Sequence, residues 1–144
     1  MLKKISPLIS PDLLRIIAEM GHGDEIVFAD GNFPAAANAR RLVRCDGHPV
    51  PPLLDAVLSL LPLDTYVKCP VALMQVVPGE DAEPVIWEEY RRIIAAHDPA
   101  AADTFEMVER FAFYERAAQA YAIVATSESA LYANIILKKG VITP

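Results

Sequence analysis

A glycine-flanked turn, Gly21-His22-Gly23-Asp24, lies between a helix pattern and a buried-strand pattern, and it constrains the fold more than any other stretch. The helix pattern before it stops at Gly21, as helices commonly do when glycine follows the last turn. The apolar segment after it, residues 25–29, ends at Asp30. This order of elements is typical of an α/β domain, in which ligands bind outside the carboxyl ends of strands.

A strand over residues 25–29 is about 17 Å long, which places His22 near its start and Asp30 at its end. The two side chains of one chain therefore meet only if a loop folds back. The other possibility is that a neighbouring subunit completes the site. On this ground we expect oligomerisation to matter.

Helix and strand patterns alternate along the rest of the chain. Apolar residues at spacings of three and four predict helices, and short apolar runs between turn residues predict strands. We expect helices from Ser10 to Gly21, within residues 34–41, from Pro51 to Pro62, from Pro84 to His97 and over Glu109–Gln119. We expect strands over residues 25–29, 42–45, 71–77, 121–126 and 132–138.

This alternation predicts a single α/β domain over residues 1–144, built in three layers. A mostly parallel or mixed sheet forms the middle layer, with helices on both faces. Residues 71–77 are apolar nearly throughout, which is typical of an interior strand covered on both sides. Because only a short turn, residues 127–129, joins the last two strands, we expect these two to be an antiparallel pair.

The chain has 144 residues, of which 53 % are hydrophobic and 22 % are charged, and its net charge is −6. This length suits one domain with its own core. The excess of hydrophobic residues indicates that some apolar surface is buried against other copies of the chain. The negative charge argues against a nucleic-acid partner, because phosphate binding needs a clustered basic surface.

Neither a secretory signal nor a membrane span is expected. Residues 1–7 lack the apolar core of a signal peptide, and no apolar run reaches the ~18–20 residues that cross a bilayer. Cys45 and Cys69 are the only cysteines, and we expect them to be reduced packing residues. The sequence therefore predicts a cytoplasmic protein.

His22 is the candidate acid–base group, because imidazole titrates near neutrality. Asp24 is placed to hold one ring nitrogen and leave the other for a substrate. The alternative is that both are solvated turn residues. His48 and His97 lie beside prolines and show no ligand spacing with His22, so no metal site is expected.

Asp30, Arg110 and the segment Tyr132-Ala133-Asn134 are candidate binding residues. Asp30 ends an apolar strand, where a carboxylate accepts hydroxyl protons or caps the next helix. Tyr stacks on the C–H face of a sugar, and Asn offers a donor and an acceptor to hydroxyl groups. The alternatives are a solvated helix arginine at Arg110 and an ordinary strand start at Tyr132.

Several kinds of site are missing from the sequence. It contains no glycine-rich phosphate loop, no Cys-x-x-Cys pair and no strand–turn–helix context for a nucleophilic serine. What is left is a polar pocket that uses no cofactor, with one acid–base histidine.

Four blocks resemble the L-fucose mutarotases: residues 1–11, residues 19–26, Arg110-Phe111-Ala112-Phe113-Tyr114-Glu115-Arg116-Ala117, and residues 132–141. The resemblance runs from one end of the chain to the other and is weakest between residues 35 and 103. The wider family includes D-ribose pyranases, which share the Gly-His turn, the Asp after the first strand and the Tyr-Ala-Asn segment. They lack the block that begins at Arg110, which favours the fucose branch.

The resemblance implies an isomerase that interconverts sugar anomers without a cofactor. It implies that His22, supported by Asp24, is the general acid, and that Asp30, Arg110 and Tyr132-Ala133-Asn134 bind the sugar. It also implies a decameric ring with sites at subunit boundaries. Some fucose mutarotases carry His where this chain has Asn32 and Ala36, a departure that bears on the choice of sugar.

Two other functions stay open at this point. One is a pyranase that acts on ribose or a related sugar. The other is a monosaccharide-binding protein on the same scaffold that does not catalyse exchange. His22 argues against the second, because a binding protein needs hydroxyl partners but no group that titrates near neutrality. The group that takes the anomeric proton is left open between Tyr132 and a water molecule.

Overall fold

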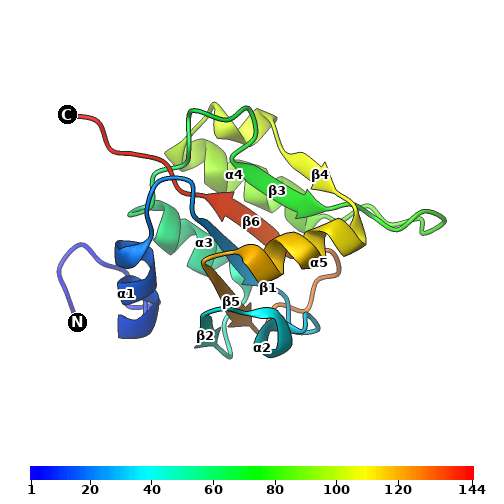
Figure 1. Cartoon of the computed structure of the whole chain (residues 1–144), viewed down its shortest axis with the longest axis horizontal. Coiled ribbons are helices and arrows are strands. Elements are labelled where there is room, and N and C mark those ends of the chain that lie inside the picture. The colour runs from blue at the N-terminus through cyan, green and yellow to red at the C-terminus, as the bar shows by residue number, and fades with distance from the viewer.

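The computed structural model describes residues 1–144 as a six-stranded sheet with helices packed on it (Figure 1). The strands are β1 (Glu25–Ala29), β2 (Leu42–Cys45), β3 (Val71–Met74), β4 (Glu106–Val108), β5 (Ala122–Thr126) and β6 (Ile135–Lys138). The helices are α1 (Pro11–Glu19), α2 (Ala35–Asn38), α3 (Val50–Leu58), α4 (Ile86–His97), the single 3-10 turn Ala101–Asp103, and α5 (Arg110–Gln119).

The strand order is β2-β5-β1-β6-β3-β4. All neighbouring strands are parallel except at β6, which runs antiparallel to both β1 and β3. The mixed α/β sheet predicted from the sequence is therefore confirmed.

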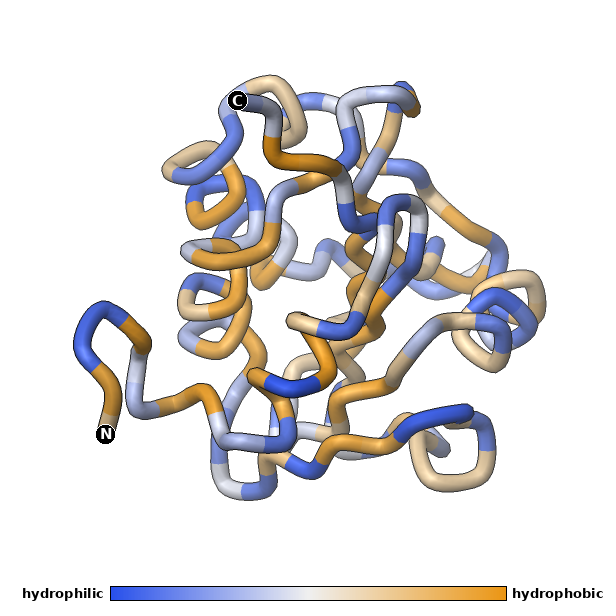
Figure 2. The backbone as a smooth tube through the Cα atoms, turned by 60° about the vertical axis from the view of Figure 1, so that its left-hand side comes forward, coloured by the Kyte–Doolittle hydropathy of each residue, from blue (hydrophilic) through white to orange (hydrophobic).

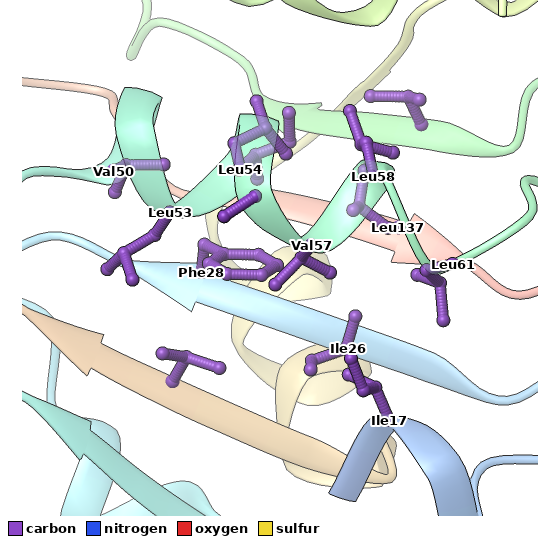
Figure 3. Close-up of a cluster of buried hydrophobic side chains, with 14 of the residues drawn as sticks. Ile17, Ile26, Phe28, Val50, Leu53, Leu54, Val57, Leu58, Leu61 and Leu137 are labelled. Atoms are coloured by element: carbon purple, nitrogen blue, oxygen red, sulfur yellow. The ribbon is translucent and has the colours of Figure 1, made fainter. Parts of the chain in front are cut away.

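Helices cover both faces of the sheet, which gives the three layers that the sequence predicts. Apolar side chains of α1, α3 and α4 pack with one face of the strands in the larger cluster of 29 buried residues. Side chains of α2 and α5 pack with the other face in a cluster of 13. In Figure 3, Leu53, Leu54 and Val57 of α3 lie over Phe28 of β1, and Ile17 of α1 lies beside Ile26.

Short hydrophobic and hydrophilic segments follow one another along the backbone tube in Figure 2. The start of α1 follows the sequence pattern, because the Ser10 hydroxyl accepts a hydrogen bond from the Leu13 backbone N–H at 3.1 Å. None of the helices combines the length and the hydrophobicity that a membrane-spanning helix requires.

The prediction that the last two strands form an antiparallel pair is wrong. β5 and β6 do run in opposite directions, but β1 lies between them and is hydrogen-bonded to both. The connection between β5 and β6 is long enough to pass over the end of β1, because the chain does not become a strand until Ile135. Residues 127–134 are thereby placed beside the end of β1.

Three further differences concern the strand bounds. β3 ends at Met74 and β6 begins only at Ile135, so both are shorter than their apolar runs suggest. β4 was not predicted, because it has three residues and two of them are exposed. β4 is the last strand at one side of the sheet. Its sequence therefore shows no alternation of apolar and polar residues by which a strand could be recognised.

Polar residues from distant parts of the chain lie together at one end of the sheet, the end at which the parallel strands stop. β1, β3 and β4 end there, and β6 begins there because it is antiparallel to its neighbours. Phe28 near the end of β1 pairs with Ile135 at the start of β6. Residues after β1 and residues before β6 must therefore lie side by side.

Candidate functional site

A cavity of about 270 Å³ lies at this end of the sheet, where β1 ends and β6 begins. It is lined by residues from β3, α5 and the loops that follow β1, β3 and β5. The lining residues are Asp30, Asn32, Phe33, Met74, Val77, Glu80, Arg110, Tyr114, Leu131, Tyr132 and Asn134. Four of the predicted binding residues, Asp30, Arg110, Tyr132 and Asn134, thus come together.

Two hydrogen bonds join Asp30 and Asn134, which both line this cavity. The Asp30 backbone N–H donates to Asn134 Oδ1 at 2.8 Å, and Asn134 Nδ2 donates to Asp30 Oδ2 at 3.0 Å. The other oxygen, Asp30 Oδ1, accepts from the Asn32 backbone N–H at 2.9 Å. Both side chains are buried, so their orientation is fixed before any ligand arrives.

The pKa of Asp30 is raised above its ordinary value, mainly because burial disfavours the carboxylate. Hydrogen bonds from the Asn32 and Phe33 backbone and from Asn134 oppose this rise, and the nearby Glu128 adds to it. A partly desolvated carboxylate with fixed orientation is a strong acceptor for sugar hydroxyl groups.

Helix α4 holds the segment before β6 in place. Trp87 Nε1 donates to the Tyr132 carbonyl at 2.8 Å, and the Tyr90 hydroxyl donates to the Ala133 carbonyl at 2.7 Å. Tyr132 has φ +56°, in the left-handed region, so these contacts stabilise a conformation that non-glycine residues rarely adopt. Ala133 itself is fully buried and does not line the cavity, unlike its two neighbours.

Arg110 is the first residue of α5 and supplies the only cation of the cavity wall. Its guanidinium lies 5.9 Å from the ring centroid of Tyr114, one turn further along the helix. The Tyr114 ring stacks on Phe33, with centroids 5.3 Å apart. α5 therefore presents a positive charge and an aromatic ring to the same ligand space.

The His22 turn lies at the other end of β1, outside this cavity. The Gly23 backbone N–H donates to the Lys139 carbonyl at 2.9 Å, and Gly23 has φ +85°. The imidazole packs against Tyr66, with ring centroids 5.2 Å apart. The separation of His22 and Asp30 within one chain, expected from the length of the strand, is confirmed.

The carboxylate next to His22 is Asp64 and not Asp24. His22 Nε2 lies 3.1 Å from Asp64 Oδ1, whereas Asp24 Oδ2 accepts from the Gly21 backbone N–H at 2.7 Å. The expectation that Asp24 holds the imidazole is therefore corrected. The turn needs a local acceptor for its own N–H, and Asp24 is the residue within reach.

Asp64 fixes the direction of the hydrogen bond to His22. Burial tends to raise the pKa of Asp64, but the Tyr66 backbone N–H and His22 together hold this pKa below its ordinary value. Because an ionised carboxylate only accepts, Nε2 of His22 must carry the proton. Nδ1 is then the nitrogen available for exchange with a substrate, and the imidazole, 45 % exposed, is accessible.

The structure adds residues that the sequence did not single out: Asp64, Met74, Glu80 and Tyr114. Only Tyr114 carries a usable signal, since it stands four residues after Arg110 and so shares its helix face. No group of three or more His, Cys, Asp or Glu side chains is arranged to hold a metal ion. The site therefore offers carboxylates, one guanidinium, amide groups and aromatic faces, which are the groups that recognise sugars.

The chain is similar to proteins of known family over nearly its whole length. The model of the RbsD / FucU transport protein family matches residues 3–142. The L-fucose mutarotase of Actinobacillus pleuropneumoniae serotype 5b is 49 % identical over 141 residues, which cover 98 % of this chain and 97 % of that protein. The human fucose mutarotase is 49 % identical over 147 residues, which cover 98 % and 94 %.

Solved structures agree with these relatives. The fucose mutarotase of Streptococcus pneumoniae in complex with L-fucose has a TM-score of 0.92 and 53 % identity, covering 99 % of this chain and 100 % of that one. FucU of Bifidobacterium longum has a TM-score of 0.94 and 49 % identity, covering 96 % and 99 %. RbsD of Bacillus subtilis, complexed with D-ribose, is 20 % identical with a TM-score of 0.72 and shares the fold. The resemblance seen in the sequence is confirmed, and the chain belongs to the RbsD / FucU transport protein family.

Proposed function

We propose that this protein is an L-fucose mutarotase, an isomerase that interconverts the α and β anomers of the sugar. The observation that carries the proposal is the cavity at the end of β1, in which Asp30 and Asn134 are locked beside Arg110 and Tyr132. The relative solved with L-fucose shares 53 % of the sequence, whereas the relative solved with D-ribose shares 20 %. L-fucose is therefore favoured over ribose.

The reaction opens and closes a hemiacetal ring, which leaves the oxidation state unchanged. The ring oxygen must gain a proton while the anomeric hydroxyl loses one, after which the carbonyl turns and the ring closes on its other face. We assign the proton for the ring oxygen to His22 in its imidazolium form, in which Nε2 keeps its proton toward Asp64 and Nδ1 carries the proton that is given. A water molecule takes the proton of the anomeric hydroxyl, and the reverse transfers close the ring. A positioned acid–base group of this kind contributes about 10²–10⁴ in rate.

The binding roles follow from the chemistry of the cavity. Asp30 accepts hydrogen bonds from sugar hydroxyl groups, and the Asn134 amide beside it can donate one and accept another. Arg110 donates to a sugar oxygen, and Tyr114 offers an aromatic face to C–H groups. The role of Ala133 is limited to the backbone that carries Tyr132 and Asn134, and Asp24 supports the His22 turn.

We further propose that the active unit is a ring of subunits, a decamer as the resemblance seen in the sequence implies, in which His22 of one subunit faces the cavity of another. The support is the separation of His22 from the cavity and the exposed apolar side chains near both regions. Tyr66 beside His22 is 74 % exposed, and Phe111 and Leu131 beside the cavity are 68 % and 67 % exposed. Light scattering coupled to gel filtration measures the subunit number.

We also propose a cytoplasmic location, which is supported by the two free cysteine thiols, a state that a reducing compartment preserves. Cell fractionation tests it.

Saturation-exchange NMR on L-fucose tests the function. The wild-type protein is expected to raise the rate of exchange between the two anomeric protons, and His22→Ala is expected to return it to the rate in buffer. Parallel measurements on D-ribose and D-galactose rank the substrates. A folded wild-type protein that binds L-fucose without raising exchange contradicts the mutarotase and supports the binding-protein alternative.

A further inference from the structure

The loop between β3 and α4, residues 75–85, extends away from the end of the sheet (Figure 1) and supplies one carboxylate, Glu80, to the cavity wall. The Tyr132 hydroxyl donates a hydrogen bond to Glu80 Oε2. The same hydroxyl oxygen accepts from the Val77 backbone N–H at 3.2 Å. Val77 and Glu80 of this loop thus both form hydrogen bonds with the hydroxyl of Tyr132, which lines the cavity.

We propose that Glu80 is a positioning residue that sets Tyr132 as a hydrogen-bond acceptor toward the sugar. The inference rests on the proposed function, because it assumes a sugar in the cavity. A phenol oxygen has one proton to give and lone pairs to accept with. With the proton directed at Glu80 and one lone pair taken by Val77, one acceptor position of the Tyr132 oxygen is left for a ligand in the cavity that Tyr132 lines.

The charges around Tyr132 agree with this direction. The hydrogen bond to Glu80 is the largest cause that raises the pKa of Tyr132, and burial and the charge of Glu80 add to the rise. The Val77 backbone N–H and the charge of Arg110 act in the opposite direction. The phenol therefore stays protonated, and its proton stays on the side of Glu80.

A consequence is that Tyr132 does not donate to the substrate and is not an anionic base. A sugar hydroxyl must donate to the Tyr132 oxygen, so its own oxygen is free to accept from Arg110 across the same cavity. Glu80 acts on the sugar only through Tyr132. Its removal should therefore weaken sugar binding more than it slows the bound sugar's exchange.

The variants that test the proposal are Glu80→Ala and Glu80→Gln, with Asp81→Asn as matched control. Asp81 is an exposed acid in the same loop that makes no hydrogen bond or ion pair and does not line the cavity. Glu80→Ala is expected to raise KM for L-fucose about ten-fold, the usual scale for losing a charged hydrogen-bond partner. Glu80→Gln keeps an acceptor oxygen and should recover most of the loss, and Asp81→Asn should match the wild type.

Two readouts separate positioning from a structural effect. NMR titration of ¹³C-tyrosine should show the Tyr132 pKa falling toward its ordinary value of 10.0 in Glu80→Ala. The effect of Glu80→Ala on KM should also vanish when Tyr132 is already Phe, because both changes act on one hydroxyl. An unchanged KM and Tyr132 pKa in Glu80→Ala, or a full KM effect in the Tyr132→Phe background, would overturn the proposal.

Binding of L-fucose, followed by chemical-shift titration, repeats the comparison without catalysis. If the wild type binds but does not exchange the anomers, the proposed function fails while the Glu80 variants still decide the inference through Kd. If the wild type exchanges and Glu80→Ala behaves as Asp81→Asn does, the inference alone fails.

Discussion

Asp30 and Asn134 are 104 residues apart in the chain, yet they form a buried pair in which each donates a hydrogen bond to the other. The pairing exists because β6 runs antiparallel beside β1, so that the segment after one strand meets the segment before the other. The pair therefore joins the fold and the binding site, and its loss should affect both.

Asn134→Ala should lower the free energy of unfolding by about 1–3 kcal/mol, because it leaves the buried Asp30 N–H and Asp30 Oδ2 without their partner. Urea denaturation at a fixed protein concentration measures the change. Asn38→Ala is the matched control, since the Asn38 amide only donates to the Pro34 carbonyl at an exposed site. Equal losses in the two variants would contradict this account of the pair.

Gly140→Ala should be destabilising by about 1–3 kcal/mol, the usual cost of overpacking. A methyl group there would lie 2.8 Å from the Asp64 Cα and even closer to the Leu63 carbonyl oxygen. The backbone of Asp64 must shift to make room, so anomer exchange should fall as well. Thermal unfolding and exchange NMR follow both effects.

Gly21→Ala serves as the comparison for stability, because its new methyl group meets nothing closer than Asp24 Oδ2 at 3.6 Å. That distance is an ordinary contact, so Gly21→Ala should unfold near the wild-type temperature. A Gly140→Ala protein as stable as Gly21→Ala would show that residues 62–64 move away freely.

Asp64 should make the protein more stable at neutral pH than in acid. Its pKa in the folded protein lies below its ordinary value of 3.8, although burial acts to raise it. The ionised carboxylate therefore contributes stability above that ordinary value, and the contribution is lost as the pH falls through the folded-state pKa. Asp64→Asn should thus be less stable than wild type near pH 7, with a difference that shrinks on acidification.

Chemical denaturation at several pH values measures this difference. Asp46→Asn is the control, because the pKa of Asp46 is also lowered, by Arg44, but the ion pair is exposed and contributes little in water. If Asp64→Asn shows no greater pH dependence than Asp46→Asn, the buried carboxylate does not stabilise the His22 turn.

Much of this architecture was predictable from local patterns, because helix caps, apolar periodicity and turns act over a few residues. Ser10 caps α1 as its side-chain chemistry requires, and Asp30 follows an apolar strand as expected. The start of α5 was predicted one residue early, at Glu109, which is in fact the cap of that helix. Errors of this size come from helix ends, where cap and first turn look alike.

The long-range partners were not predictable in the same way. Asp64 lies 42 residues from His22, and Glu80 lies 52 residues from Tyr132. Their positions depend on the order of strands in the sheet, which is decided by packing of whole faces and not by the residues near each site. Asp24 was the natural choice for His22 from sequence distance alone, and the turn's own backbone uses it instead.

The separation of His22 from Asp30 leads to a complementation experiment. Asp30→Ala and His22→Ala should each abolish exchange as pure oligomers. We consider oligomers that assemble at random from equal amounts of the two variants. If each site takes Asp30 from one subunit and His22 from a neighbour, about one site in four then has both residues intact. Mixing the two variants after partial denaturation, then refolding together, should therefore restore about a quarter of the wild-type exchange.

Arg110→Ala mixed with Asp30→Ala is the control for this experiment. Both residues line the cavity of the same chain, so every cavity in that mixture lacks one of them and exchange should stay at the level in buffer. No recovery when His22→Ala is mixed with Asp30→Ala would mean that one chain brings His22 to its own cavity. Recovery in the control would mean instead that Asp30 and Arg110 of one chain do not serve the same site. The strand between them makes that arrangement difficult, since β1 is hydrogen-bonded on both sides and cannot fold back.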